Sequence, residues 1–334
     1  MSYASEKKKL EEKWKKIKRI LFFVVAGFVA VLGILSIFYG TKTWKYRINL
    51  PKIAVRAENE LRIHFIDVGQ GDATVIELPD GKIMLIDGGS NSDKSVMALL
   101  KYLNALKIKT IDYLVLTHAD GDHCGGLDEV LEYFTVSRVF MPYAKPTLNK
   151  EFASFYQAVL REECTIDYTS RGISLSTHSY DLQFLYPYFS EVQGAVEKGE
   201  YMDADNENSA VLWLNYKGVS ALFTGDAPAS VTQKLINEEE LELLGNLGVT
   251  LNSTEILKVS HHGSEDGTNA EILRYLGVET AVISCGADNE YKHPAIEVCS
   301  ALEECGVQTY RTDKDGNIII AIDENGEYGA EKIA

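Results

Sequence analysis

Cysteine is scarce in this sequence, and its spacing follows no metal-binding or disulfide framework. The 334 residues include five Cys, which is an odd number, and no two of them form a C-x-x-C pair. This pattern excludes a zinc knuckle and a disulfide scaffold. Cys299 and Cys305 are near enough in sequence to pair in an oxidising compartment, and we expect several of the five to be small core residues.

Basic residues are few in most of the chain relative to acidic residues. Up to Arg56 there are 13 Lys and Arg against three Asp and Glu, a net charge of +10. The residues after Arg56 include 20 basic and 46 acidic side chains, a net charge of −26. An acidic surface repels nucleic acid at long range, which argues against a binding module that relies on a basic surface. An enzyme that meets phosphate through bound cations is still compatible with this charge.

One stretch of the chain lacks charge altogether. Residues 20–39 (ILFFVVAGFVAVLGILSIFY) have about the length needed to cross a hydrocarbon core of ~30 Å. Eight Lys and Arg precede this stretch and five follow it, so the positive-inside rule predicts a single-pass anchor with residues 1–19 as a basic cytoplasmic head. Residues 40–59 would then be a linker, and a hydrolase domain at 60–334 would be extracellular.

A signal peptide and a core helix fit the apolar stretch less well than an anchor does. A cleaved signal peptide usually has a shorter apolar region, roughly 7–15 residues, that ends in an A-x-A-like pattern. Here the stretch ends in Ser-Ile-Phe-Tyr-Gly, which favours an anchor that is not cleaved. A buried core helix is disfavoured because the stretch has no polar face.

Internal repeats and low-complexity tracts are absent after residue 60, and apolar periodicity predicts a mixed α/β domain. Strand patterns come first, and strands then alternate with helices, which is typical of sheets covered by helices. Residues 187–208 are polar and acidic, and we expect them to form a loop near the functional site. The expected strands are 61–65, 73–78, 83–86, 111–116, 182–186, 210–216, 219–224, 256–259, 281–284 and 317–322; the expected helices are 95–107, 152–162, 229–236, 270–275 and 295–304.

Polar side chains gather directly after the strand expected at 111–116. Residues 117–126 read THADGDHCGG, and four possible metal ligands fall within six residues: His118, Asp120, Asp122 and His123. Carboxylates and imidazoles packed together without a cation would leave costly unpaired charge, which a metal ion removes. A polar surface turn is the alternative, but two His beside the acids at this spacing favour a metal site.

The same string resembles the H-x-H-x-D-H signature of the metallo-β-lactamase superfamily, with Asp120 in place of the second His. Two further blocks follow in the same order, TGD at 224–226 and KVSHHGS at 258–264, each after an apolar strand. The details resemble the metallo-β-lactamase-like domain of ComEC-type competence proteins, through DVGQGDA at 67–73, Asn208-Ser209 and His293-Pro294. This resemblance covers roughly residues 60–324 and implies a four-layer αββα sandwich with a metal cleft between the sheet edges.

The resemblance also implies a ligand set for one or two divalent metal ions. The first ion would be held by His118 and Asp120, the second by Asp122, His123 and His261, with Asp226 bridging both. The superfamily's further His between the first block and TGD is missing, and Asn208 stands at roughly its place. A carboxylate-rich first site favours manganese more than a histidine-rich zinc site does, so zinc and manganese both stay open.

Several residues are candidates for catalysis. A water made acidic by the metal would attack phosphorus or a carbonyl carbon, and Asp122 would orient it. His262 and His293 are candidates to stabilise developing charge or to protonate the leaving group. Each has a structural alternative, since His262 can instead support His261 and His293 can fix the entry to a helix before Pro294.

Other residues are candidates for substrate contact. Asn208, Ser264 and Lys292 are expected near the substrate, although Ser264 can equally cap a turn and Lys292 can be simply solvated. In the glycine-rich segment at 67–73, Asp67, Gln70 and Asp72 are expected to be structural first.

The favoured function is a membrane-anchored, metal-dependent phosphodiesterase or nuclease, because ComEC-type domains are associated with degrading a DNA strand. Single-stranded DNA is therefore a candidate partner, although the acidic body argues against long nucleic acid. A lone anchor without a multi-spanning channel segment is not expected to carry DNA across a membrane. Hydrolysis of a small ester, lactone or thioester is the second hypothesis, and a metal-stabilised binding protein without turnover is the third.

Overall fold

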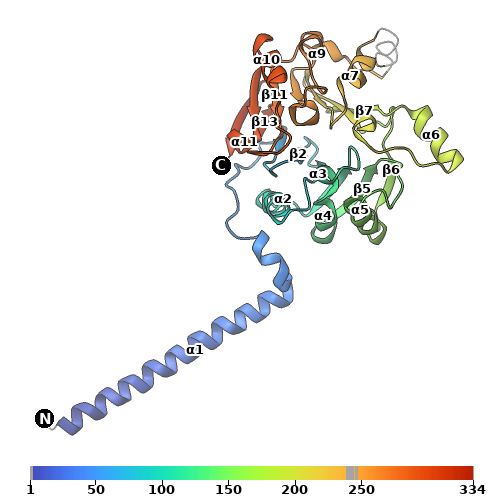
Figure 1. Ribbon diagram of the computed structural model, residues 1–334. Coiled ribbons are helices and arrows are strands. Elements are labelled where there is room, and N and C mark those ends of the chain that lie inside the picture. The colour runs from blue at the N-terminus through green and yellow to red at the C-terminus, as the bar shows by residue number, and fades with distance from the viewer. Residues whose placement is uncertain (1–2, 238–243, 245–246, 334) are drawn as a thin grey trace. The chain divides into compact units, whose positions relative to one another are not determined.

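The computed structural model describes residues 3–237, 244 and 247–333, which form two compact units, Met1–Ile48 and Asn49–Ala334. The first unit is the long helix α1 (Tyr3–Thr43), followed by the short helix η1 (Trp44–Tyr46) (Figure 1). Its segment Glu6–Ser36 is long and apolar enough to cross a membrane by length and composition. The helix is longer than the expected span 20–39, because the Lys and Glu residues before it are good helix formers.

The second unit contains two mixed sheets. The larger has eight strands in the order β14-β13-β1-β2-β3-β4-β5-β6, antiparallel as far as β3 and parallel from β3 to β6. The smaller has six strands in the order β12-β11-β10-β9-β8-β7, antiparallel from β7 to β9 and parallel from β9 to β12. The strands are β1 (Leu61–Phe65), β2 (Thr74–Glu77), β3 (Ile83–Ile86), β4 (Thr110–Val115), β5 (Thr135–Met141), β6 (Thr165–Tyr168), β7 (Asp181–Tyr186), β8 (Val211–Tyr216), β9 (Val219–Phe223), β10 (Ile256–Lys258), β11 (Thr280–Ile283), β12 (Gln308–Arg311), β13 (Asn317–Ile322) and β14 (Tyr328–Ile333).

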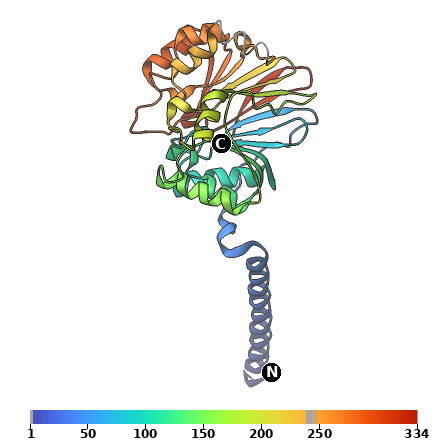
Figure 2. The same cartoon turned by 90° about the vertical axis from the view of Figure 1, so that its right-hand side faces the viewer.

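Helices cover the outer faces of the two sheets, which gives the four layers αββα (Figure 1, Figure 2). On the eight-stranded sheet lie α2, α4 and α5, and on the six-stranded sheet lie α7, α9 and α10. The helices of this unit are α2 (Asp93–Ala105), α3 (Gly121–Cys124), α4 (Leu127–Tyr133), α5 (Lys150–Arg161), α6 (Phe189–Lys198), η2 (Asn206–Asn208), α7 (Ala229–Ile236), η3 (Leu251–Ser253), η4 (Ser260–Gly263), α9 (Ala270–Leu276), α10 (Ile296–Glu304) and α11 (Thr312–Asp315). The predicted αββα sandwich is confirmed.

The main hydrophobic core lies between the two sheets. It combines buried side chains of both sheets, such as Phe65 of β1 against Phe223 of β9, whose ring centroids are 6.4 Å apart. A second cluster fills the space between the six-stranded sheet and its helices, with Leu235, Leu273 and Leu302 buried there. These cores fix both sheets as one rigid frame, and the polar loops that matter for function extend from the strand ends.

Residues 187–208 differ from the expected loop. They include the helix α6, which places Val192 in a buried position and ends at Gly199 in the left-handed conformation, with φ of 67°. The acidic composition concealed the helix, because its apolar positions are few. The later part of the segment does lie at the site, since the Ala119 amide donates to the Ala204 carbonyl. Four strands, β5, β6, β12 and β14, were not predicted from apolar alternation.

Candidate metal centre

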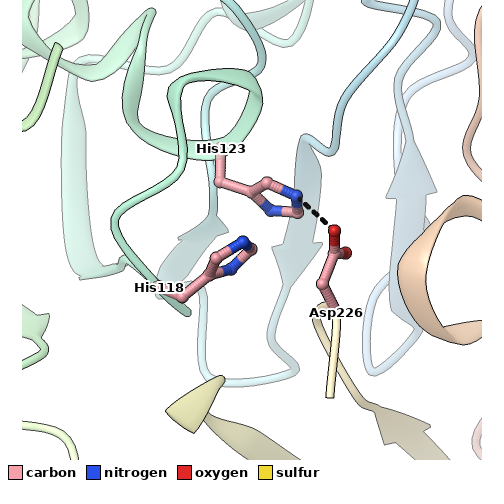
Figure 3. Close-up of side chains that lie close together, drawn as sticks. All are labelled: His118, His123 and Asp226. Atoms are coloured by element: carbon pink, nitrogen blue, oxygen red, sulfur yellow. Dashed lines mark ion pairs between the residues drawn. The ribbon is translucent and has the colours of Figure 1, made fainter. Parts of the chain in front are cut away.

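Three loops bring the candidate ligands together, each directly after a strand. His118 follows β4, Asp226 follows β9, and His262 follows β10. The strands β9 and β10 are parallel neighbours in the six-stranded sheet, so the loops after them lie at the same edge of that sheet, and the loop after β4 of the eight-stranded sheet meets them there. Figure 3 shows the side chains of His118, His123 and Asp226 pointing toward one another, with the His118 and His123 ring centroids 4.1 Å apart.

Four overlapping groups of side chains have ligand atoms within 4.8 Å of one another, close enough to hold a metal ion. Their members are all His or Asp and most are buried. The groups are His118, His123 and Asp226; Asp122, His123 and His262; Asp72, Asp226 and His262; and Asp72, Asp87 and His123. Because each group shares a residue with another, the donor atoms form one continuous centre.

The structure places His262, rather than His261, among these groups. His262 is buried, and its Nε2 lies 3.3 Å from both Asp122 Oδ2 and Asp226 Oδ2. The more exposed His261 has its Nε2 3.8 Å from Asp226 and its Nδ1 3.3 Å from Asp266. Both residues adopt the left-handed conformation in η4, with φ of 49° and 54°, and this tight turn directs the second ring inward. His262, expected to act at the leaving group, thus lies among the possible metal ligands, and His261, expected to be a ligand, lies beside them.

Asp120 lies at the margin of the centre. Its side chain is 54% exposed, its Oδ2 is 3.7 Å from His118 Nε2, and it belongs to none of the four groups. In these positions, a metal ion beside His118 would be held by His118, His123 and Asp226.

The donor atoms fit a metal ion because several of them are buried without a hydrogen-bond partner. Among the described residues, buried side-chain atoms at this centre without a hydrogen-bond partner are His118 Nε2, His123 Nε2, His262 Nε2, Asp72 Oδ1 and Asp226 Oδ1. Leaving a buried polar atom unsatisfied costs about 1–3 kcal/mol, so five at one place indicate a common partner. Imidazole nitrogens and carboxylate oxygens are ligands of zinc and manganese.

Two hydrogen bonds fix which nitrogen of each histidine faces the centre. His123 Nδ1 lies 2.8 Å from Asp87 Oδ2, and His262 Nδ1 lies 2.9 Å from the Ser284 carbonyl oxygen. Both partners accept only, so each Nδ1 carries the hydrogen and each Nε2 lone pair is directed at the centre. Asp87, which follows directly after β3, was not among the residues predicted for the site.

The histidines and carboxylates of the centre shift one another's pKa. Burial alone raises the pKa of the Asp226 carboxyl, but the neighbouring His123 and His262 outweigh burial and hold that pKa well below its usual range. Burial alone lowers the pKa of His123, but Asp226 and Asp87 outweigh it and hold that pKa well above the usual value. A metal ion would displace these protons from imidazole, so its binding releases protons.

A buried lysine stands directly behind the ligands. Lys258 forms an ion pair with Asp72, donates a hydrogen bond to the Gly225 carbonyl at 3.0 Å, and lies 3.8 Å from Asp226 Oδ1. Asp72 was expected to be structural, and it does hold this lysine, but it also lines the centre with Asp226 and His262. Asp72 lies in the DVGQGDA string and Lys258 begins the KVSHHGS string, but nothing in the sequence indicates that these two residues pair.

The expected substrate residues lie at different depths. The Asn208 amide donates to Asp205 Oδ1 at 3.1 Å, whereas the Asn206 amide lies 3.3 Å from His261 Nε2 and is the asparagine beside the site. Ser264 is buried, and its backbone amide donates to the His261 carbonyl, as in a turn. Lys292 is exposed, with φ of 63°.

His293 lies beside the centre. Its ring centroid is 5.4 Å from that of His261 and 6.3 Å from that of His262. Burial, with the charges of His261 and His262, lowers its pKa. Its Nδ1 is buried without a hydrogen-bond partner, so this side chain has a free position for a proton or a substrate atom.

Comparison with known proteins agrees with this architecture. The profile of the Metallo-beta-lactamase superfamily matches residues 66–287. ComE operon protein 3 of Bacillus subtilis is 30% identical over 275 residues, which are 78% of this chain and 33% of that protein. Competence protein ComA of Neisseria gonorrhoeae is 27% identical over 307 residues, which are 91% of this chain and 39% of that protein.

The chain thus spans about a third of the length of the curated relatives that it matches. Among solved structures, the diiron beta-hydroxylase CmlA from Streptomyces venezuelae is 13% identical, with a TM-score of 0.48, and the match covers 83% of this chain and 55% of that chain. The family profile accounts for most of the second unit and for all the strands that carry the metal centre. This chain belongs to the metallo-beta-lactamase superfamily.

Proposed function

We propose that this chain is a membrane-anchored, metal-dependent hydrolase that cleaves phosphodiesters. The observation that carries the proposal is the set of unsatisfied donor atoms of His118, His123, His262 and Asp226, which face one another beside the partly exposed Asp122. Such a centre serves hydrolysis because a bound divalent metal lowers the pKa of water and stabilises a developing oxyanion. Zinc and manganese are both candidates, as one ion or two.

The protein's own residues would position the reacting groups. Asp122 has a side chain 30% exposed, it lines the open cavity beside the centre, and its Oδ2 is 3.3 Å from His262 Nε2. Burial alone raises the pKa of Asp122, but the neighbouring imidazoles of His262 and His123 outweigh burial and lower that pKa, so the carboxylate stays ionised and can orient an attacking water by accepting a hydrogen bond from it. His293, with a lowered pKa and an unoccupied Nδ1, is placed to act at the leaving group.

A second candidate function is hydrolysis of a small neutral ester, lactone or thioester. The cavity beside the centre is lined by the carboxylates of Asp67, Asp120, Asp122 and Asp313, which repel a polyanion. This charge favours a short substrate with few phosphates over a long nucleic acid. The similarity to a relative named as a competence protein makes single-stranded DNA a partner to be tested.

The decisive experiment uses the full chain in detergent micelles, stripped of metal and refilled with manganese or zinc. Hydrolysis of bis-p-nitrophenyl phosphate is expected to depend on the added metal and to be lost in D122A. The matched control D181A removes an exposed carboxylate at the start of β7 and should hydrolyse at the wild-type rate. Suppose instead that the chain binds metal tightly and hydrolyses a thioester or lactone but no phosphodiester. That outcome would contradict the phosphodiesterase proposal and support hydrolysis of carbonyl substrates. Binding without any turnover would indicate a metal-stabilised binding protein.

The anchor is a separate part of the proposal. The apolar part of α1 has the length and composition of a membrane span, and eight basic residues precede residues 20–39 against five that follow. We therefore place the N-terminus in the cytoplasm and the second unit outside. Protease added to intact cells is expected to remove the second unit, and a unit that is protected until the cells are lysed would contradict this orientation.

A further inference from the structure

A cavity of about 660 Å³ opens beside the metal centre. One edge is formed by Asp120, Gly121 and Asp122, and the other walls come from the loops after β1, before α2 and after β11. Its volume falls within the ~300–1,000 Å³ that is usual for small-molecule sites. Because Asp122 lines both the cavity and the centre, the cavity is open to a substrate bound at the centre.

Tyr291 gives one wall of the cavity an exposed aromatic ring. It is 68% exposed, and its ring is stacked on that of His293, with centroids 5.7 Å apart and planes inclined by 24°. His293 in turn is stacked toward His262, at 6.3 Å and 29°. The three rings form a series from the cavity to the metal centre, in which the His293 ring lies between Tyr291 and His262.

The loop that carries Tyr291 is held in place by its neighbours. The Asn289 side chain donates to the carbonyls of Gly286 and His293, and its oxygen accepts from the His293 amide. The Gly286 amide donates to Gln70 Oε1 at 3.1 Å, and a Cβ at Gly286 would lie 2.6 Å from the Gln70 nitrogen, so the two loops are in close contact. A ring held in this way loses little freedom when a ligand stacks on it.

The charge of the cavity walls determines which planar chemical group can bind beside Tyr291. Lys94 is the one basic residue among the described residues that line the cavity, against the carboxylates of Asp67, Asp120, Asp122 and Asp313. A second phosphate deep in the cavity would be repelled, whereas an uncharged heterocycle would not. Nucleobases stack on exposed tyrosine rings, and the ring backing by His293 suits this geometry.

We propose that this cavity is a nucleoside subsite, in which a nucleobase stacks on Tyr291 while the attached phosphodiester lies at the metal centre. The inference rests on the proposed phosphodiesterase function and names the substrate class of that site. Tyr291 would then be a specificity-determining residue that favours nucleotide esters over simple alkyl esters. Stacking does not distinguish strongly among bases, so the subsite accepts nucleotides of different sequence.

The test compares two esters with the same leaving group, thymidine 5′-(p-nitrophenyl phosphate) and methyl p-nitrophenyl phosphate. With the full metal-loaded chain in micelles, Y291A is expected to lower kcat/KM for the nucleoside ester by about tenfold more than for the methyl ester. Y291F keeps the ring and should retain the preference. The control F189A removes another exposed aromatic ring, on α6 and outside the cavity, and should change neither rate.

Equal losses on both esters in Y291A, or no loss on either, would overturn the nucleoside subsite while leaving phosphodiester hydrolysis intact. If the wild-type chain hydrolyses neither ester, the proposed function fails, and calorimetric binding of thymidine 5′-monophosphate then decides the subsite separately. Binding at least tenfold tighter in the wild type than in Y291A would support it. Equal binding would refute it.

Discussion

Asp87 Oδ2 lies 2.8 Å from His123 Nδ1, and the same carboxylate accepts hydrogen bonds from the amide and hydroxyl of Thr117 at 2.8 and 2.7 Å. Asp87 itself adopts the left-handed conformation, with φ of 58°, at the end of β3. One buried carboxylate thereby joins two neighbouring strand ends and fixes the ring of a candidate ligand. Partners of this kind set both the tautomer and the basicity of a metal-binding histidine.

The variant D87N is therefore expected to weaken metal binding roughly 10- to 100-fold, because the neutral amide no longer holds the His123 imidazole as strongly. Isothermal titration of the stripped full chain with zinc or manganese measures the change. D112N is a suitable control, since Asp112 also accepts a backbone amide from a neighbouring strand, at 2.9 Å from Ile83, but lies outside the metal groups. Equal affinities of D87N and wild type would show that Asp87 supports the fold alone.

The two adjacent histidines of η4 provide a second prediction. His262 Nε2 is buried and lies 3.3 Å from two carboxylates. H262A should therefore lower the affinity for metal by more than the roughly 10- to 100-fold that is typical of removing a group that orients a ligand. H261A should retain its metal, since that ring faces Asp266 and Asn206 as well. Metal analysis after dialysis distinguishes them, and the opposite order would restore His261 as the ligand.

The sequence predicted much of this site because the ligands cluster in short strings after apolar strands. THADGDHCGG at 117–126 and TGD at 224–226 each follow a strand, and periodicity located those strands to within a residue or two. The choice between His261 and His262 could not be made in this way. It depends on two consecutive left-handed residues in η4, which no apolar pattern records.

Contacts between residues that are far apart in the chain could not be predicted from the sequence either. Lys258 and Asp72 are separated by more than 180 positions, and Asp87 meets His123 only because β3 and β4 are neighbours in the sheet. The helix α6 was missed because its buried face is a single valine among acidic residues. Composition identified the apolar segment of α1 and the different net charges of the two parts of the chain, whereas tertiary packing determines which polar residues meet.

A third prediction concerns pH and lies away from the metal centre. His64 is fully buried, with Nε2 3.0 Å from Glu77 Oε1 and Nδ1 3.0 Å from the Tyr102 hydroxyl. Burial outweighs the attraction of Glu77 and lowers the pKa of His64, so the folded chain takes up its proton only below the unfolded value of about 6.5. The unfolded state then binds more protons as the pH falls, and stability is lost below about pH 6.5.

Between pH 7.5 and 5.5 this residue alone should cost up to about 1.4 kcal/mol in the free energy of unfolding. The variant H64Q cannot titrate and should show a correspondingly smaller loss over the same interval. Urea unfolding of both chains at the two pH values gives the difference, which cancels the contributions of the other histidines. A wild-type chain that loses no more stability than H64Q would refute the assignment.

The buried pair of Lys258 and Asp72 gives the last prediction. K258M removes the cation and leaves the Asp72 carboxylate buried without its partner, which typically costs about 3–5 kcal/mol. The double variant K258M/D72N removes both charges and should recover most of that loss, because the remaining groups are neutral. Urea unfolding of the wild type, both single variants and the double variant measures the coupling between the two residues. Additive losses would mean that the two side chains contribute independently, and a large recovery would identify Lys258 as the counter-ion that allows a carboxylate to lie behind the metal ligands.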